Sequence, residues 1–298
     1  MAEWNKILEE IHDDNSQAPI DKIRKKYIKQ FSKLTGRNVI CYYSGFLSCS
    51  DNVNATIGDS DLNGFMTVIS GLDKSLGLDL IIHSPGGDVA ATEAIGNYLR
   101  GVFNNDIRIF VPQIAMSGGT MLACIGSEIY MGKYSSLGPI DPQYGGLPAY
   151  GVIQEFEQAK EEIINNPQSI PFWQSVIAKY PPAFIGQCYK AVQLSYEVLE
   201  NWLRDGNMFI SDAKKEQKIT KIMEYLNNTE ISKIHSRHIG VEMAKNIGLR
   251  VTSLEDNCDI QDAILSIHNC YMHTFQGTNA IKIFENQCDV SFIVINDK

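Results

Sequence analysis

The sequence predicts an α/β protein with a largely parallel sheet, on observations from the middle third of the chain. Short apolar runs typical of buried strands lie at 78–82, 107–111 and 128–131. Glycine-containing turns follow the first two runs and lead into helical patterns at 89–103 and 118–126. Strands that alternate with helices pair in parallel through right-handed crossovers. This periodicity alone is also compatible with a doubly wound sheet.

The elements before this core are predicted in chain order. Residues 1–35 are expected to be helical, because apolar residues recur among lysines along 20–34. A strand is expected at 38–46, and a helix at 62–76. The polar stretch Gly58-Asp59-Ser60-Asp61 precedes this helix, and its side chains are interpreted as helix caps in preference to metal ligands.

The elements after the core are less regular. The stretch 133–148 is rich in Gly, Pro and Ser and is predicted to be a loop. Later elements are expected as helices at 151–164, 183–204, 212–226 and 262–275 and a short strand at 290–295. The chain is therefore divided into an N-terminal helical arm (1–35), a core (36–205) and a mostly helical C-terminal region that packs on the core (206–298).

Composition and charge restrict the class of protein. The 298 residues are 44% hydrophobic and 20% charged, as in an ordinary globular protein. The formal net charge of −9 argues against broad binding of nucleic acid or anionic membranes. The seven cysteines form no CxxC pair, and the charged N-terminus does not resemble a secretory signal, so free thiols and a cytoplasmic location are expected. No cofactor or metal is expected.

The uncharged stretch 109–127 is nearly long enough to span a bilayer. Pro112, Gln113 and the small polar residues from Ser117 to Thr120 interrupt it in the middle. We therefore expect a buried strand, a turn and a helix here instead of a membrane span.

Ser117 lies in the turn of this stretch, within Ala115-Met116-Ser117-Gly118-Gly119. A serine between a strand and a helix can present its hydroxyl clear of the sheet, beside free backbone N–H groups at the helix start. A second turn, His83-Ser84-Pro85-Gly86-Gly87-Asp88, follows the preceding strand, and its glycines let N–H groups approach a bound group closely. Together the turns suggest a nucleophile beside an oxyanion hole.

These two turns resemble the paired motifs of the Clp-protease and signal-peptide-peptidase group of serine peptidases, which share a crotonase-like fold. Within this group the chain resembles the serine dehydrogenase proteinase family, from about Ile20 to Glu285. The family takes its name from the degradation of serine dehydrogenase, and the name does not imply a redox enzyme. Besides the Ser117 turn, the resemblance rests on Tyr42-Tyr43-Ser44, Gly58-Asp59-Ser60-Asp61, His83-Ser84-Pro85-Gly86-Gly87 and Ser135-Ser136-Leu137-Gly138-Pro139-Ile140-Asp141-Pro142-Gln143.

The resemblance implies a spiral of β-β-α units with added N-terminal and C-terminal helices. It also implies that Ser117 is the nucleophile of a peptidase and that the N–H groups of Gly87 and Gly118, with Gly86 in the same turn, form the oxyanion hole. Members of the group assemble into rings or cages, so a homo-oligomer with enclosed sites and a polypeptide substrate are expected. No GxxxxGK[ST] motif occurs, so the chain itself is expected to be ATP-independent.

The general base is less clearly marked. Clp proteases carry a histidine in the loop where this sequence has Asp141, whereas signal-peptide peptidases use a lysine farther along the chain. Lys160 falls at a comparable spacing and is the first candidate, although Glu161 and Glu162 follow it and a lysine acts as a base only when neutral. Other possible bases are Lys133, Lys179, Lys190, His83 and Asp141. Asp141 is also expected among the oxyanion or substrate-binding residues, where it could orient a base or cap a turn.

Other interpretations remain open at this level. The stretch 229–251 could be a helix-turn-helix, but its thin basic face favours the Ala-x-x-x-Gly-Leu ending of the Clp group. His235 and His238 make a weak metal pair without a third ligand. On the same fold, the chain could instead be an acyl-CoA hydratase or thioesterase, or a non-catalytic scaffold that binds peptides.

Overall fold

The computed structural model describes residues 4–49, 53–227 and 236–296 and confirms the α/β class. In this part of the chain a seven-stranded sheet has the order β11-β10-β1-β2-β3-β5-β9. The strands from β1 to β9 in this order pair in parallel, whereas β10 is antiparallel to both of its neighbours. The strands are β1 (Asn38–Ser44), β2 (Leu78–His83), β3 (Ile107–Val111), β5 (Glu128–Met131), β9 (Val251–Ser253), β10 (Ala280–Asn286) and β11 (Ser291–Ile295).

A second, smaller layer makes the fold a spiral of β-β-α units, as the resemblance implied. Strands β2, β3 and β5 each run on into a short extended segment beyond the main sheet. These segments are Ser84, β4 (Ile114–Ala115) and β6 (Ser136–Leu137). Ser84 bridges to Ala115, and β4 pairs in parallel with β6. The two predicted turns therefore lie side by side where the chain leaves this layer.

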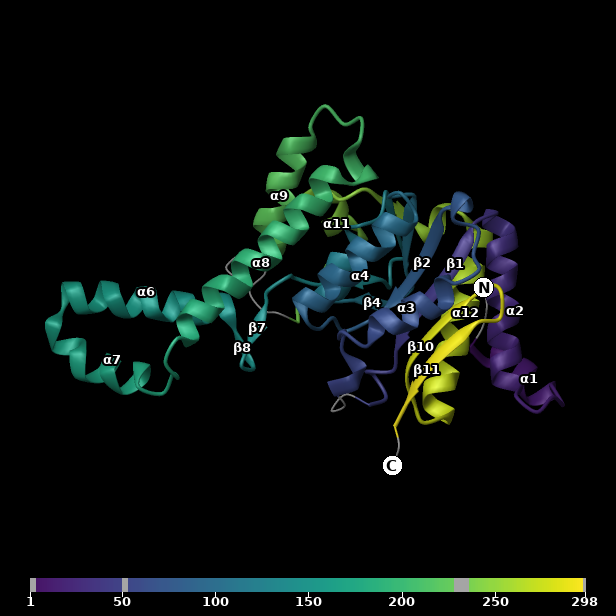
Figure 1. The fold of residues 1–298 in the computed structure, drawn as a ribbon, viewed down its shortest axis with the longest axis horizontal. Coiled ribbons are helices and arrows are strands. Elements are labelled where there is room, and N and C mark those ends of the chain that lie inside the picture. The colour runs from purple at the N-terminus through teal and green to yellow at the C-terminus, as the bar shows by residue number, and fades with distance from the viewer. Residues whose placement is uncertain (1–3, 50–52, 228–235, 297–298) are drawn as a thin grey trace.

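Helices cover both faces of the sheet, because alternate residues of each central strand are buried on opposite sides. On β1, Val39, Cys41 and Tyr43 pack under α2 (Pro19–Thr35) and α12 (Cys258–Gly277). Ile40 and Tyr42 face the opposite helix layer (Figure 1). That layer contains α3 (Asp61–Ile69), α4 (Val89–Val102), α5 (Gly118–Ala123), α9 (Lys215–Asn227) and α11 (Val241–Ile247).

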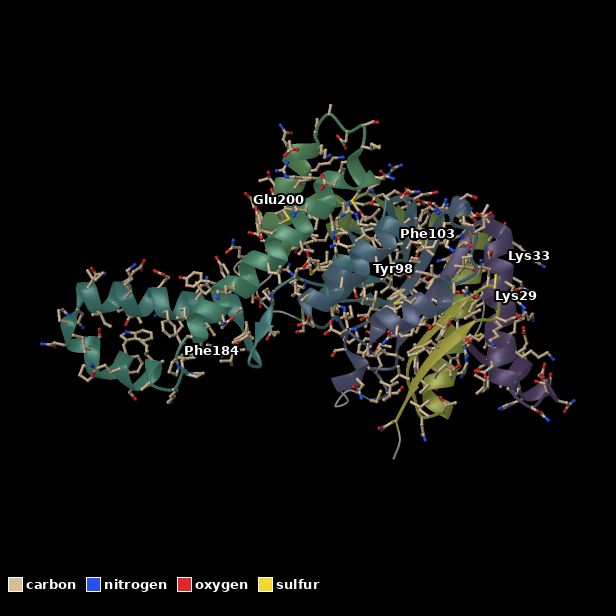
Figure 2. The ribbon with its side chains drawn as sticks, in the orientation of Figure 1. Lys29, Lys33, Tyr98, Phe103, Phe184 and Glu200 are labelled. Atoms are coloured by element: carbon tan, nitrogen blue, oxygen red, sulfur yellow. The ribbon has the colours of Figure 1, made fainter. Side chains whose placement is uncertain are left out.

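An arm of helices extends from the body of the molecule (Figure 1). It contains α6 (Ala149–Asn165), α7 (Ile170–Ile177) and the start of α8 (Phe184–Asp205), and the hairpin β7 (Gln143–Tyr144) and β8 (Leu147–Pro148) lies at its base. A small cluster of Ala149, Val152, Phe184 and Cys188 holds α6 against α8 (Figure 2). On the arm, Ile164 is 70% exposed and Phe172 62% exposed.

The remaining elements are short or peripheral. Helix α1 (Trp4–Asp13) contributes Ile7 and Ile11 to a small cluster against α2 and α12. Short 3-10 helices lie at Val53–Ala55, Lys74–Leu76, Pro167–Ser169, Asn207–Phe209 and Leu254–Asp256.

Most predicted elements are present. Strand β9 was not predicted, the short strands β6, β7 and β8 lie in the stretch predicted to be a loop, and three other points differ. The helix predicted at 62–76 ends at Ile69, since Gly71 has a φ of +79°. Ser60 makes no side-chain capping bond, so the predicted cap is wrong there, and Asp61 instead points into the core. Strand β10 was not predicted, because Lys282 and Glu285 interrupt its apolar pattern. The helix start predicted at 229 lies outside the described residues.

The uncharged stretch 109–127 forms part of β3, then β4 and α5, as predicted. Its residues are largely buried between the helix layers. Within the described ranges, no helix is long and apolar enough to cross a membrane.

A buried ion pair ties the N-terminal helix to β10. Arg24 on α2 is fully buried, and its guanidinium donates to both carboxylate oxygens of Glu285, with Nη2 to Oε1 at 2.8 Å. Tyr271 and Ser291 also donate to Glu285, each at 2.8 Å. The carboxylate is thus satisfied although it lies inside the protein.

Replacing Arg24 alone with Met is expected to lower the free energy of unfolding by about 3–5 kcal/mol, because Glu285 is left charged and unpaired. The double variant Arg24→Met, Glu285→Gln is expected to recover much of this loss. Urea unfolding at neutral pH measures both values. Equal stability of the single variant and wild type would contradict the prediction.

Candidate active site

Ser117 occupies a strained turn between β4 and α5. Its φ of 49° and ψ of −115° are outside the region that residues with a side chain normally adopt. Three backbone hydrogen bonds hold the turn: Met116 N–H to Ser84 O at 3.0 Å, Gly119 N–H to Met116 O at 2.7 Å, and Met121 N–H to Ser117 O at 3.0 Å. Such strain costs about 1–3 kcal/mol and persists where the surroundings enforce it.

The turn after β2 packs directly on this serine. Gly86 has a φ of +93°, and a Cβ there would lie 2.5 Å from Met116 O and 2.7 Å from the Ser117 Cβ. A Cβ on Gly118 would lie 3.3 Å from the Gly87 nitrogen, so the Gly87 and Gly118 peptides adjoin. Neither the Gly87 N–H nor the Gly118 N–H donates to a backbone carbonyl within the described ranges. Two such donors beside a serine can stabilise a developing oxyanion.

These groups open into a cavity of about 530 Å³. One wall is formed by the two turns, and the other by the hairpin at the base of the arm and by α8. The cavity is lined by Thr56, Pro85, Gly86, Gly87, Asp88, Val89, Ser117, Pro142, Gln143, Tyr144, Ala191 and Leu194. The site thus joins a nucleophile and paired N–H donors to a space large enough for a ligand.

The sequence also matches a known protein family. Residues 20–282 match the family described as ClpP-like SDH-type serine proteinase. The chain belongs to this family.

Two relatives come from Methanocaldococcus jannaschii, and both bear the name of an uncharacterized protein. MJ0137 is 33% identical over 196 residues, which are 66% of this chain and 60% of that protein. MJ1495 is 34% identical over 108 residues, which are 36% of each chain. The chain therefore spans less than two thirds of the length of either relative.

Asp141 lies beside the cavity. It is buried, and burial raises the pKa of its carboxyl to about 6, while a backbone hydrogen bond from Tyr150 lowers it in part. Gln143, which lines the cavity, donates to Asp141 Oδ2 at 3.4 Å. Asp141 is therefore adjacent to the cavity but is not one of the residues that line it.

The structure does not bring Lys160 to Ser117 within this chain. Its side chain is 69% exposed on α6, and its ammonium lies 3.8 Å from Glu157. The other candidate lysines, Lys133, Lys179 and Lys190, are also exposed. Among the described residues, the cavity is lined by none of these four.

His83 is a core histidine in this structure. It is fully buried, its Nδ1 lies 3.1 Å from Ser44 O, and its Nε2 lies 3.2 Å from Gln113 Oε1. Burial lowers its pKa to about 4 despite both hydrogen bonds. His268, on α12, packs edge-on against it, and burial together with His83 lowers the pKa of His268 to about 3.

Of the predicted histidine pair, only His238 is among the described residues. His235 lies outside the described residues. His238 Nδ1 lies 2.7 Å from Ser136 Oγ, on the strand that pairs with β4. This contact fixes the edge of the small layer.

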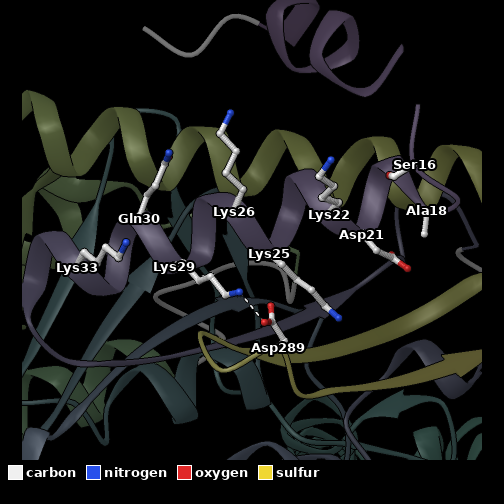
Figure 3. Close-up of a pocket in the computed structure, with 10 residues that line it drawn as sticks. All are labelled: Ser16, Ala18, Asp21, Lys22, Lys25, Lys26, Lys29, Gln30, Lys33 and Asp289. Carbon is white, nitrogen blue, oxygen red and sulfur yellow. Dashed lines mark hydrogen bonds and ion pairs between the residues drawn. The ribbon is translucent and has the colours of Figure 1, made fainter. Parts of the chain in front are cut away.

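A larger hollow lies at the other end of the molecule, along α2 (Figure 3). Its volume is about 720 Å³, and lysines dominate its lining. Lys22 pairs with Asp14, Lys26 with Glu10 at 2.7 Å, and Lys29 with Asp289. These charges are largely matched locally, and the hollow does not adjoin Ser117.

Sequence reasoning missed several residues of the site. Ala191 and Leu194 on α8 form part of the wall opposite Ser117, and only the folding of the arm brings them there. Thr56 reaches the cavity from a loop that carried no motif.

The two buried histidines predict a loss of stability in acid. The pKa values of His83 and His268 are both depressed in the folded state. The contribution of each neutral histidine to the free energy of unfolding is therefore complete above pH 6.5 and is lost as the pH falls toward 4. By pH 5 the loss is on the order of 2 kcal/mol for each histidine. Urea unfolding at pH 7.5 and pH 5 is expected to show a smaller decrease for His268→Leu than for wild type.

His12 is exposed on α1 and provides the matched control. The variant His12→Gln is expected to have the same pH dependence as wild type. If the stability of His268→Leu instead showed the same pH dependence as that of wild type, His268 would take up a proton equally well in the folded and the unfolded protein.

Proposed function

We propose that the protein is an ATP-independent serine peptidase that cleaves polypeptides through an acyl-enzyme on Ser117. The observation that carries this proposal is the serine in its strained turn, beside the Gly87 and Gly118 N–H groups and at the wall of the cavity. Membership of a serine proteinase family supports the same chemistry.

In the proposed reaction the Ser117 hydroxyl oxygen attacks the scissile carbonyl carbon while a base takes its proton. The carbonyl oxygen becomes an oxyanion that the Gly87 and Gly118 N–H groups stabilise, each contributing about 3–4 kcal/mol. Collapse of this intermediate breaks the C–N bond, and the amine leaves with the proton. Water, deprotonated by the same base, then releases the carboxylic acid and restores the serine.

We propose Lys160 of a neighbouring copy as the base. Within one chain, α6 carries Lys160 roughly 16 Å beyond the buried start of the helix at Ala149, too far for a lysine to reach back. The exposed Ile164 and Phe172 on the same arm suit contact with a second copy, which supports the proposed homo-oligomer. Asp141, with its raised pKa, is the alternative base within the chain.

The proposed surroundings follow from the same observations. All seven cysteines are free thiols in the structure, which suits a reducing compartment, and we propose a cytoplasmic location. The proposal includes neither a cofactor nor stable membrane insertion.

Labelling with a fluorophosphonate probe tests the nucleophile. Ser117→Ala is expected to lose labelling and to lower peptide turnover by roughly 10³-fold or more. Ser136→Ala is the matched control, because Ser136 contacts His238 but lies outside the cavity, and it is expected to label normally. Retained labelling of Ser117→Ala would contradict the proposal.

Two other outcomes would indicate other functions. Thioester turnover that survives in Ser117→Ala would indicate a hydratase or thioesterase, and peptide binding without cleavage in wild type would indicate a scaffold.

Mixing two inactive variants tests delivery of the base from a neighbour. Ser117→Ala and Lys160→Ala are each expected to be inactive alone. Oligomers reassembled from equal amounts are expected to regain activity at about a quarter of their sites, because some sites combine an intact serine with an intact neighbouring lysine. Full activity of Lys160→Ala would instead identify Asp141 as the base to test, through Asp141→Asn.

A further inference from the structure

A lysine is buried inside the sheet close to the proposed site. Lys282 lies on β10 and is only 2% exposed. Its ammonium donates to Asp61 Oδ1 and, at 2.8 Å, to the Thr56 carbonyl oxygen. Asp61 is 1% exposed, and its Oδ2 accepts from the Tyr42 hydroxyl at 2.7 Å. Buried charges are costly unless they are paired and hydrogen-bonded, so this arrangement holds each partner in one position.

The bond to Thr56 fixes the next residue, which holds the turn after β2. Ile57 N–H donates to Gly86 O at 2.8 Å, and Ile57 O accepts from Asp88 N–H at 3.0 Å. Ile57 and Gly87 thus form a parallel bridge. A Cβ on Gly87 would lie 2.3 Å from the Ile57 backbone, so the two strands touch.

The planarity of one peptide group links this bridge to catalysis. The Gly86 carbonyl and the Gly87 N–H belong to the same trans peptide, so they point in opposite directions. When Ile57 N–H holds the carbonyl on one side, the Gly87 N–H is directed to the other side, where the Gly118 peptide and Ser117 lie.

The segment around the bridge residue Ile57, residues 55–58, is held at three points. Ser44 Oγ donates to Ala55 O at 2.6 Å, Lys282 binds Thr56 O, and Gly58 N–H donates to Asp61 Oδ2 at 3.3 Å. Lys282 and Asp61 supply two of these three contacts. Neither side chain lines the cavity, so neither is placed to exchange a proton with substrate there.

We infer that Lys282 and Asp61 are positioning residues, which aim the Gly87 N–H at the oxyanion through Thr56 and Ile57. This inference rests on the proposed function, because it assigns the residues to the oxyanion hole of that reaction. It connects the last part of the sheet, β10, with a turn at the end of β2.

The test replaces the whole network with apolar groups, because removal of Lys282 alone would leave Asp61 charged and buried. The triple variant Tyr42→Phe, Asp61→Leu, Lys282→Met keeps the branching and approximate length of each side chain and is expected to stay folded. We expect kcat to fall about 100-fold with KM within about threefold of wild type, because one oxyanion donor is no longer held in place. We also expect faster amide hydrogen exchange at 55–58 and 86–88.

The Arg24–Glu285 pair provides a matched control, since Glu285 is also on β10 and equally buried. The variant Arg24→Met, Glu285→Gln removes a buried pair on the other face of the sheet. It is expected to leave kcat and exchange at 86–88 at wild-type values. A similar fall in kcat in this control would show that the effect is a general loss of rigidity.

The two readouts separate this inference from the proposed function. Unchanged exchange at 86–88 in the triple variant would overturn the positioning role, whatever the activity. Faster exchange with wild-type kcat would overturn the link to the oxyanion. A wild type without Ser117-dependent turnover would refute the proposed function, while exchange would still decide whether Lys282 and Asp61 hold the turn.

Discussion

The rest of the structure depends on one constraint, which is the close packing of the turn after β2 (84–88) on the turn that contains Ser117 (115–119). Gly86 lies so close to Met116 and Ser117 that no side chain fits between them. This approach is possible because β2 and β3 are parallel neighbours that end at the same edge of the sheet. The spiral topology, the small second layer and the cavity all follow from two strands that end together and turn toward one another.

Local chemistry explains why so much of this could be predicted from sequence. Strand runs, glycine turns and a serine at a strand–helix junction are short-range signals, and they predicted the α/β class, the turn at Ser117 and most helices. Strand β10 was not predicted because Lys282 and Glu285 are charged residues, which interrupt the apolar pattern expected of a buried strand. Their burial depends on Asp61 and Arg24, which lie 221 and 261 residues away along the chain, so no local pattern could reveal it.

The arm shows a different limit of sequence reasoning. Spacing along the chain proposed Lys160, but spacing does not tell in which direction a helix leaves the body. Helix α6 extends outward, and its polar face carries Lys160 into solvent (Figure 1). The same arm supplies part of the cavity wall through Ala191 and Leu194, which no motif marked because their role depends only on where α8 comes to rest.

The position of β10 has a consequence for the order of events during synthesis. Tyr42 pairs with Phe284, so β1 gains its second neighbour only after nearly the whole described chain has left the ribosome. Contacts this distant in sequence form late in folding. Until then Lys282 is absent and Asp61 has no ammonium to bind. A nascent chain that already contains Ser117 would therefore lack, until β10 has been synthesised, the Lys282 contact that we infer to hold the Gly87 turn.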